Sequence, residues 1–157
     1  MKNSLLSENI TPYVGLETFK LGMKLEEVRT ILKSNKIPFN QKIQSNKDTT
    51  DKVPWIFISI EESVTFCFAK DVMYEIYLEN SYKGVLPNGG YIGMEFRKLQ
   101  EIDPSLVYND DEEDFESKEG YWVLDNLDTK KVESITIFLP EVPSQAFYTY
   151  QWVEKYI

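Results

Sequence analysis

The chain contains no histidine and one cysteine, Cys67. Without histidine it lacks the commonest general base, the commonest zinc ligand and every Ser-His or Cys-His nucleophile pair. A single cysteine allows no intrachain disulfide, which is typical of proteins from a reducing cytoplasm. Cys67 stands between Phe66 and Phe68 in a strand pattern, so we interpret it as a small, half-buried strand residue rather than a nucleophile.

Signals for cofactors and membranes are also missing. The sequence has no glycine-rich phosphate loop followed by Lys-Ser or Lys-Thr and no dinucleotide fingerprint, and we interpret the glycines between 84 and 93 as a linker. No stretch approaches the roughly 20 apolar residues that span a bilayer, and residues 1–8 lack the apolar run of a signal peptide. We therefore expect a cytoplasmic protein with no cofactor, no metal and no membrane attachment.

The charge is strongly negative, with 26 acidic against 17 basic residues and a formal net charge of −9. Such a chain repels phosphates, so nucleic acid is not an expected partner, whereas a basic protein would be attracted. Aromatic residues make up 14% of the chain, and those outside the core are available as rigid anchors of an interface. A length of 157 residues predicts one domain.

Two stretches of the sequence resemble each other, and each opens a predicted helix. The segment 21–23 (Leu-Gly-Met) stands 71 residues before the segment 92–94 (Ile-Gly-Met). Apolar residues at helical spacing follow both, which predicts helices over 24–33 and 94–102. Self-similarity of this kind indicates one supersecondary unit used twice.

The remaining pattern predicts antiparallel strands joined by short turns. Apolar runs and alternations place them at 55–60, 64–69, 72–78, 107–108, 115–117, 121–124 and 132–139. The polar segment 41–52 predicts a solvated loop, and the aromatic tail 144–157 predicts either a short helix or an edge strand. We therefore predict an α+β fold of two tandem repeats, approximately 13–80 and 86–140. Each repeat is a helix plus an antiparallel β-meander, with the helices packed on one face of the sheet.

A run of acidic residues is the strongest local anomaly. It comprises Asp110, Asp111, Glu112, Glu113 and Asp114, followed by Glu116 and Glu119. Three interpretations stay open: a solvated loop, a contact surface for lysine and arginine residues of a partner, and a calcium loop, although the spacing is not that of an EF-hand. Outward-facing tyrosines, Tyr77 and Tyr108 among them, would add rigid anchors to a contact surface.

The Gly-Met motif and the acidic, histidine-free composition each resemble features of known families. The segment 21–28 (Leu-Gly-Met-Lys-Leu-Glu-Glu-Val), with Leu32 after it, resembles the opening of the SmpA/OmlA family of outer-membrane assembly factors, in which such a motif starts a helix before a β-meander. A doubled unit resembles the β-lactamase inhibitory proteins, which implies a concave sheet presented to an enzyme. The acidic, histidine-free composition resembles immunity proteins of polymorphic toxin and contact-dependent growth inhibition systems.

The charge, the missing catalytic residues and the repeat together favour a binding protein. We hypothesise a non-catalytic cytoplasmic immunity protein that binds a cognate toxin domain, a basic nuclease, as a monomer in a 1:1 complex and occludes its active site. The carboxylates at 110–114 and 116 would imitate phosphate charge. An alternative is a small-molecule or lipid-binding module with an apolar cavity lined by Phe66, Tyr74 and Trp122. A carboxylate-based enzyme would instead need a cleft with a perturbed carboxylate pair.

Overall fold

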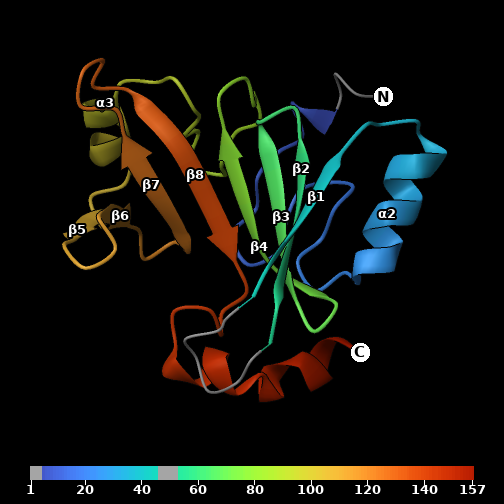
Figure 1. The fold of residues 1–157 in the computed structure, drawn as a ribbon. Coiled ribbons are helices and arrows are strands. Elements are labelled where there is room, and N and C mark those ends of the chain that lie inside the picture. Colours follow the sequence, from blue (N-terminus) through green and yellow to red (C-terminus); the bar gives the residue numbers. More distant parts are fainter. Residues whose placement is uncertain (1–4, 46–52) are drawn as a thin grey trace.

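The computed structural model describes residues 5–45 and 53–157, and the fold is α+β, as predicted. One antiparallel eight-stranded sheet has the order β1-β2-β3-β4-β8-β7-β6-β5 (Figure 1). The strands are β1 (Asn40–Gln44), β2 (Trp55–Ile60), β3 (Val64–Ala69), β4 (Val72–Glu79), β5 (Val107–Asn109), β6 (Asp114–Glu116), β7 (Tyr121–Asp125) and β8 (Val132–Phe138). The helices are α2 (Leu25–Ser34), α3 (Phe96–Ile102) and two 3₁₀ helices, η1 (Gln145–Thr149) and η2 (Gln151–Tyr156). None of the helices within the described ranges has the length and hydropathy needed to cross a bilayer.

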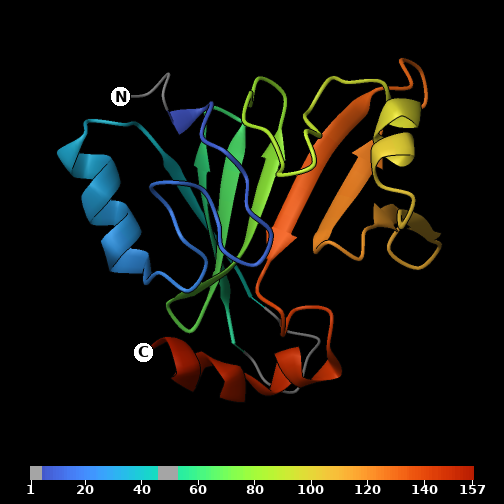
Figure 2. The same ribbon diagram turned by 180° about the vertical axis from the view of Figure 1, so that it is seen from behind.

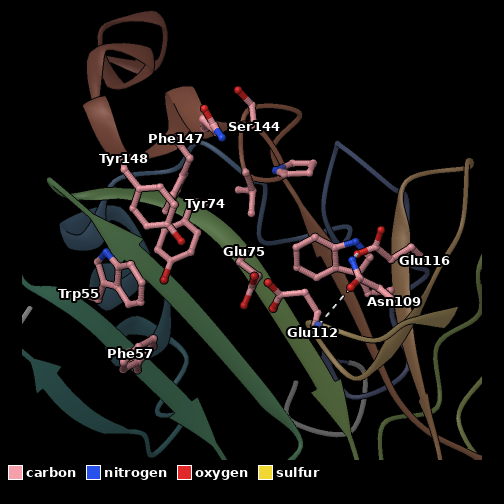
Figure 3. A pocket seen from close by; sticks show the side chains of 14 residues that line it. Trp55, Phe57, Tyr74, Glu75, Asn109, Glu112, Glu116, Ser144, Phe147 and Tyr148 are labelled. Carbon is pink, nitrogen blue, oxygen red and sulfur yellow. Dashed lines mark hydrogen bonds between the residues drawn. The ribbon is translucent and has the colours of Figure 1, made fainter. Parts of the chain in front are cut away.

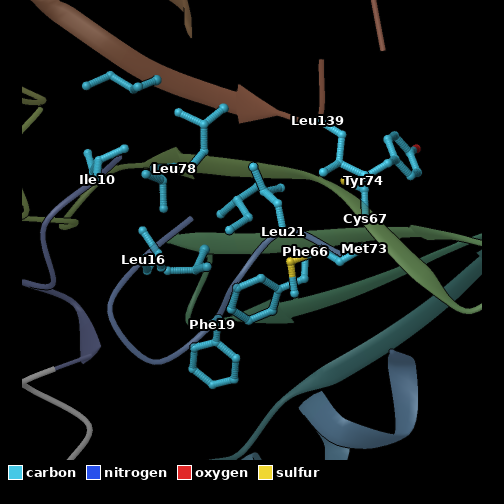
Figure 4. Close-up of a cluster of buried hydrophobic side chains, with 14 of the residues drawn as sticks. Ile10, Leu16, Phe19, Leu21, Phe66, Cys67, Met73, Tyr74, Leu78 and Leu139 are labelled. Atoms are coloured by element: carbon cyan, nitrogen blue, oxygen red, sulfur yellow. The ribbon is translucent and has the colours of Figure 1, made fainter. Parts of the chain in front are cut away.

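One face of the sheet, which we call the closed face, forms the hydrophobic core. The strand register aligns its side chains across six strands, and nearly all of them are fully buried. They are Ile58, Ile60, Val64, Phe66, Ile76, Leu78, Ile135, Ile137, Tyr121, Val123 and Phe115. The segment 5–23 crosses this side of the sheet in the view from behind (Figure 2). It adds apolar side chains to the cluster in Figure 4, where the ring of Phe19 lies 4.7 Å from that of Phe66.

The opposite face, which we call the open face, carries a mixed set of polar and aromatic side chains. The same register aligns Phe57, Thr65, Cys67, Glu75, Tyr77, Thr136, Phe138, Trp122 and Glu116. Buried apolar residues thus alternate along the strands with residues of mixed character, most of them partly exposed, as in an antiparallel sheet with two unlike faces. The open face is therefore the more accessible of the two.

Both α-helices begin slightly later than the periodicity predicts, and for the same reason. Lys24 and Glu95, the residues before the helices, have extended backbones and form isolated β-bridges to Val72 and Lys131. The bridge satisfies backbone groups that a helix would otherwise use, so the helix starts at the next residue. In α2 the buried residues Leu25, Val28 and Leu32 form one apolar stripe.

The chain turns into the two helices through matching sets of backbone hydrogen bonds. In the first set, Gly22 N donates to Met73 O (2.9 Å), Met73 N to Met23 O (2.9 Å) and Leu25 N to Asp71 O (2.9 Å). In the second, Gly93 N donates to Val132 O (2.9 Å), Val132 N to Met94 O (2.9 Å) and Phe96 N to Lys130 O (3.0 Å). Gly22 and Gly93 adopt φ values of +93° and +96°, a region that favours glycine.

The two halves of the sheet also share the position of an irregularity. The β3–β4 register shifts between Cys67 and Phe68, and the β7–β8 register shifts between Leu124 and Asp125. Met73 and Val132, which make the same backbone hydrogen bonds to the two Gly-Met segments, are 59 residues apart. Tyr77 and Thr136, which pair across β4 and β8, are separated by the same number of residues.

One segment differs from the sequence-based prediction, and the C-terminal tail takes the helical one of its two predicted alternatives. The polar stretch predicted as a loop over 41–52 contains β1, which pairs with β2, and its residues 46–52 lie outside the described residues. All five β1 side chains are exposed, so the strand is held by backbone pairing at the sheet edge and shows no apolar alternation. The tail forms η1 and η2, separated by Tyr150 in the left-handed conformation (φ 57°), rather than an edge strand.

The buried carboxylate of Asp103 holds the segment after α3 in place by hydrogen bonds. Asp103 is 2% exposed, and its oxygens accept hydrogen bonds from the hydroxyls of Ser105, Ser117 and Tyr121. Burial alone would raise the pKa of Asp103, but the hydrogen bonds from these hydroxyls lower it overall. The group is therefore held as a carboxylate in the folded protein.

Candidate functional site

A pocket of about 550 Å³ lies where the C-terminal tail meets the open face (Figure 3). We call it the open-face pocket. Its lining residues come from β2, β4, β7, the β5–β6 hairpin and the tail. They are Trp55, Phe57, Tyr74, Glu75, Asn109, Glu112, Glu116, Trp122, Val142, Pro143, Ser144, Gln145, Phe147 and Tyr148. Its volume falls in the range of small-ligand sites.

Aromatic side chains form the wall on the tail side. Tyr74 lies at the bulge between β3 and β4, and its ring centroid is 5.0 Å from that of Phe147 in η1. Trp55 lies 6.0 Å from Tyr74, and its indole Nε1 donates to the Tyr150 hydroxyl at 3.1 Å. Bulges commonly redirect a side chain, and this one accompanies the contact between Tyr74 and the tail.

Glu75 of β4 contributes a carboxyl group to the pocket between neighbours that exclude water. Its cross-strand partners are Cys67 and Phe138, and the Phe138 ring packs 4.2 Å from that of Trp122. The Cys67 thiol donates a weak hydrogen bond to Glu75 Oε2 at 3.7 Å. Burial raises the pKa of Glu75 to about 7, an effect that the Cys67 bond opposes and the charges of Asp114 and Glu112 increase.

The β5–β6 hairpin brings further carboxylates to the same face. Asn109 Oδ1 accepts from the backbone N–H groups of Asp111 (2.9 Å) and Glu112 (3.2 Å), which closes the turn. Asn109 also donates to Glu116 Oε2 at 2.9 Å. Burial raises the pKa of Asp114 to about 6, and the charges of Glu116 and Glu112 add to the shift.

The structure gathers half of the residues that the sequence predicts for the site. Glu112 and Glu116 line the open-face pocket. Asp114 and Tyr77 line an adjacent hollow of about 100 Å³, which shares Glu112 and Trp122 with the pocket. These four residues and Glu75 therefore form one acidic area on the open face.

The other predicted site residues point elsewhere. Asp110, Asp111 and Glu113 are exposed at the tip of the β5–β6 turn and line neither hollow. Tyr108 alternates away from the open face, and its ring packs 5.1 Å from Phe115 on the side of α3. The run is therefore a tight turn between two short strands rather than one continuous surface.

Sequence reasoning missed the residues that complete the pocket. Glu75, Trp55 and Phe147 lie far from the acidic run in the sequence, and only the strand order brings them to it. One signal was present: Glu75 is the charged residue in the interior of strand β4, where only the terminal Glu79 is charged besides it. A charge in such a strand indicates the face that the strand leaves open.

The expected apolar cavity lined by Phe66, Tyr74 and Trp122 is not formed by these three residues. Phe66 is fully buried on the closed face, while Trp122 lies on the open face. Tyr74 and Trp122 do line the open-face pocket together with the carboxylates. The cleft therefore combines aromatic rings with the carboxyl group of Glu75, whose pKa is raised, and Asp114 lies in the adjacent hollow. This arrangement suits a cation and also meets the first requirement for acid–base chemistry.

Two other observations bear on the choice of site. Residues 5–45 and 53–157 contain no group of three or more Cys, Asp or Glu side chains arranged to hold a metal ion. A second hollow, of about 700 Å³, lies beside α3 between Arg97, Leu127 and Lys131 and contains none of the predicted site residues.

Comparisons with protein-family models, curated proteins and solved structures give no match to this chain.

Proposed function

We propose that this chain is a non-catalytic cytoplasmic immunity protein that binds a cognate toxin domain, a basic nuclease, in a 1:1 complex and occludes its active site. The observation that carries the proposal is the acidic area on the open face, where Glu75, Glu112, Asp114 and Glu116 adjoin aromatic rings. A basic partner would compensate these charges, and its surface would cover the rings.

The ion pairs of the protein support this assignment. The two that join described residues are Arg29–Glu26 and Lys155–Glu141, and neither includes a carboxylate of the acidic area. The charges of Asp114 and Glu112 add to the burial that raises the pKa of Glu75, and the charges of Glu116 and Glu112 add to the burial that raises the pKa of Asp114. Among the described residues no cation forms an ion pair with these carboxylates. Like charges held together lower stability, and a basic partner would compensate them.

We also propose the finer architecture of the fold: two copies of one helix–meander unit, approximately 13–80 and 86–140, with both helices packed on the closed face. The matching hydrogen bonds at Gly22 and Gly93 and the shared register shifts support the duplication. For α3, the Phe96 ring lies 4.5 Å from that of Phe115, a closed-face residue. This arrangement leaves the open face free for a partner.

The experiment is to mix the protein with the product of the gene immediately upstream and to measure complex formation and nuclease activity. We expect a 1:1 complex at micromolar concentration and loss of nuclease activity. Two variants separate the two parts of the acidic run: Glu112→Lys with Glu116→Lys changes the pocket, whereas Asp110→Lys with Asp111→Lys changes the turn tip. We expect the pocket variant to weaken the complex more than the tip variant. Absence of a complex at micromolar concentration would contradict the proposal.

A second candidate, a small-molecule-binding module, is favoured by the volume of the open-face pocket, which is about 550 Å³. It predicts that a small molecule remains bound to the purified protein under native mass spectrometry. It also predicts that Tyr148→Ala, at a 55% exposed side chain lining the pocket, releases that molecule. A partner complex unaffected by pocket substitutions, together with a retained small molecule, would favour this candidate over the immunity protein.

A further inference from the structure

We infer that the open-face pocket binds the side chain of an arginine presented by the partner protein. The inference deepens the proposed function and rests on it. The pocket combines two features that together match a guanidinium group: aromatic rings on the tail side and carboxylates on the hairpin side (Figure 3). An arginine side chain has an apolar stem, a planar cation that stacks on rings, and five N–H donors.

Aromatic residues form one wall of the pocket. Tyr74 and Phe147 are 5% and 3% exposed, so the ring surface open to the stem and the cation comes mainly from Trp55, which is partly exposed, and from Tyr148. Trp55, Tyr74 and Phe147 lie within 5.0–6.4 Å of one another, measured between ring centroids, and form a continuous wall. Trp122 lies on the hairpin side and packs against Phe138. A cation within about 6 Å of such a ring is attracted by its quadrupole, and more strongly where water is excluded.

The carboxylates provide acceptors for the donors of the guanidinium. Glu75 and Glu112 lie side by side in the view of Figure 3. Glu116 is oriented by a hydrogen bond from the side-chain amide of Asn109. The adjacent hollow contains Asp114 Oδ1, a buried oxygen without a hydrogen-bond partner among the described residues. A buried acceptor of this kind is costly unless a donor reaches it, and its carboxyl group adds to the acidic character of the face beside the open-face pocket.

Other occupants fit the same residues less well. An anion would be repelled by the carboxylates, and an apolar side chain would leave Glu75 and Glu112 desolvated and uncompensated. A lysine ammonium would be attracted, but it is more strongly hydrated than a guanidinium and presents no plane to stack on the rings. The combination of stacking surface and several carboxylate acceptors therefore favours arginine.

The test titrates the isolated protein with Nα-acetyl-arginine methylamide and follows the tryptophan indole N–H signals by NMR. The chain has three tryptophans, and two of them, Trp55 and Trp122, line the pocket. The third is an internal control, because Trp152 is 5% exposed and its indole donates to Phe147 O at 2.8 Å. We expect saturable shifts of the Trp55 and Trp122 signals, with Kd on the order of millimolar for one side chain, and a weaker response to the lysine and citrulline analogues.

Three variants make the test specific. The titrations are made at pH 8, above the raised pKa of Glu75. Glu112→Gln at an exposed residue and Glu75→Gln at a half-buried one then each remove one acceptor charge, and we expect each to raise Kd about tenfold, or about 1.4 kcal/mol. Asp128→Asn on the exposed β7–β8 turn changes the net charge equally and should leave Kd unchanged.

Equal responses to arginine, lysine and citrulline analogues, or absence of shifts at Trp55 and Trp122, would overturn the inference. The outcome is separate from that of the proposed function. A toxin complex that forms with undiminished affinity in the Glu75→Gln and Glu112→Gln variants would refute the arginine site alone. Arginine binding without any toxin complex would refute the immunity function alone.

Discussion

Replacing Glu75 by glutamine should stabilise the protein, and the gain should grow as the pH rises. Burial raises the pKa of Glu75 from its ordinary 4.5 to about 7 in the folded state. At a pH between these two pKa values, the folded protein holds more protons than the unfolded chain. The free energy of unfolding therefore falls as the pH increases. Glutamine does not titrate and keeps an oxygen that can accept from the Cys67 thiol.

The magnitude follows from the shift. A difference of about 2.5 pKa units corresponds to about 3 kcal/mol, at 1.36 kcal/mol per unit, once the pH lies above both values. Near pH 5 most of this cost is absent, because Glu75 is largely protonated in the folded state. The advantage of Glu75→Gln over the wild type should therefore increase by about 2 to 3 kcal/mol between pH 5 and pH 8.

The assay is urea denaturation of both proteins across this pH range. Other groups also titrate, including Asp114 in the neighbouring hollow, so the informative quantity is the difference between variant and wild type. The control is Asp128→Asn, which removes one charge from an exposed turn and should differ from the wild type by no more than about 0.5 kcal/mol at any pH. A difference curve for Glu75→Gln that is flat between pH 5 and pH 8, or a variant less stable than the wild type at pH 8, would refute the reasoning.

Four further substitutions test the scaffold by denaturation at pH 7, and for one of them the measurement is extended to lower pH. Gly93→Ala should lower the free energy of unfolding by about 1 kcal/mol because of its positive φ alone, since its added Cβ meets no atom within 4 Å. Gly22→Ala should lower it more, because its Cβ would lie 2.8 Å from the Tyr156 ring. Equal losses in the two variants would contradict this. Phe147→Ala should cost about 3 to 5 kcal/mol, because the ring is 3% exposed, and a cost below 1 kcal/mol would show that the tail does not pack as described. Asp103→Asn should lower the free energy of unfolding by about 1 to 3 kcal/mol, since an amide offers one acceptor oxygen to three hydroxyl donors. Because the pKa of the Asp103 carboxyl is lowered in the folded state, the difference from the wild type should vanish as the pH falls through this lowered pKa. A difference that persists below it would contradict the assignment.

The helices and most strands were predictable because their apolar residues repeat at the period of the element. The stripe Leu25, Val28 and Leu32 and the alternation in β4 are such cases. Strand β1 was missed because all its side chains are exposed, so pairing rather than patterning makes it a strand. The start of each helix was misplaced by one or two residues because Lys24 and Glu95 form bridges to distant strands, which no local pattern encodes.

The candidate site was predictable only in part, since it depends on strand order. The acidic run was visible as a composition anomaly, and its members Glu112, Asp114 and Glu116 do reach the open face. Which members of the run would face outward was decided by the two-residue alternation of β6 and by the turn at Asn109. Glu75 joins them because β4 and β8 are adjacent at the centre of the sheet, a long-range pairing between the two halves of the chain.

The measurement that tests the central claim most directly is the affinity for the product of the upstream gene as a function of salt concentration. It should be made for the wild type, for Glu112→Lys with Glu116→Lys, and for the single control Asp128→Lys. The account predicts that the wild-type affinity falls with increasing salt, and that the double variant binds at least about tenfold more weakly with a reduced salt dependence. The control should follow the wild type. No binding by the wild type, or identical affinity and salt dependence in the double variant, would contradict the claim that the acidic open face binds a basic partner.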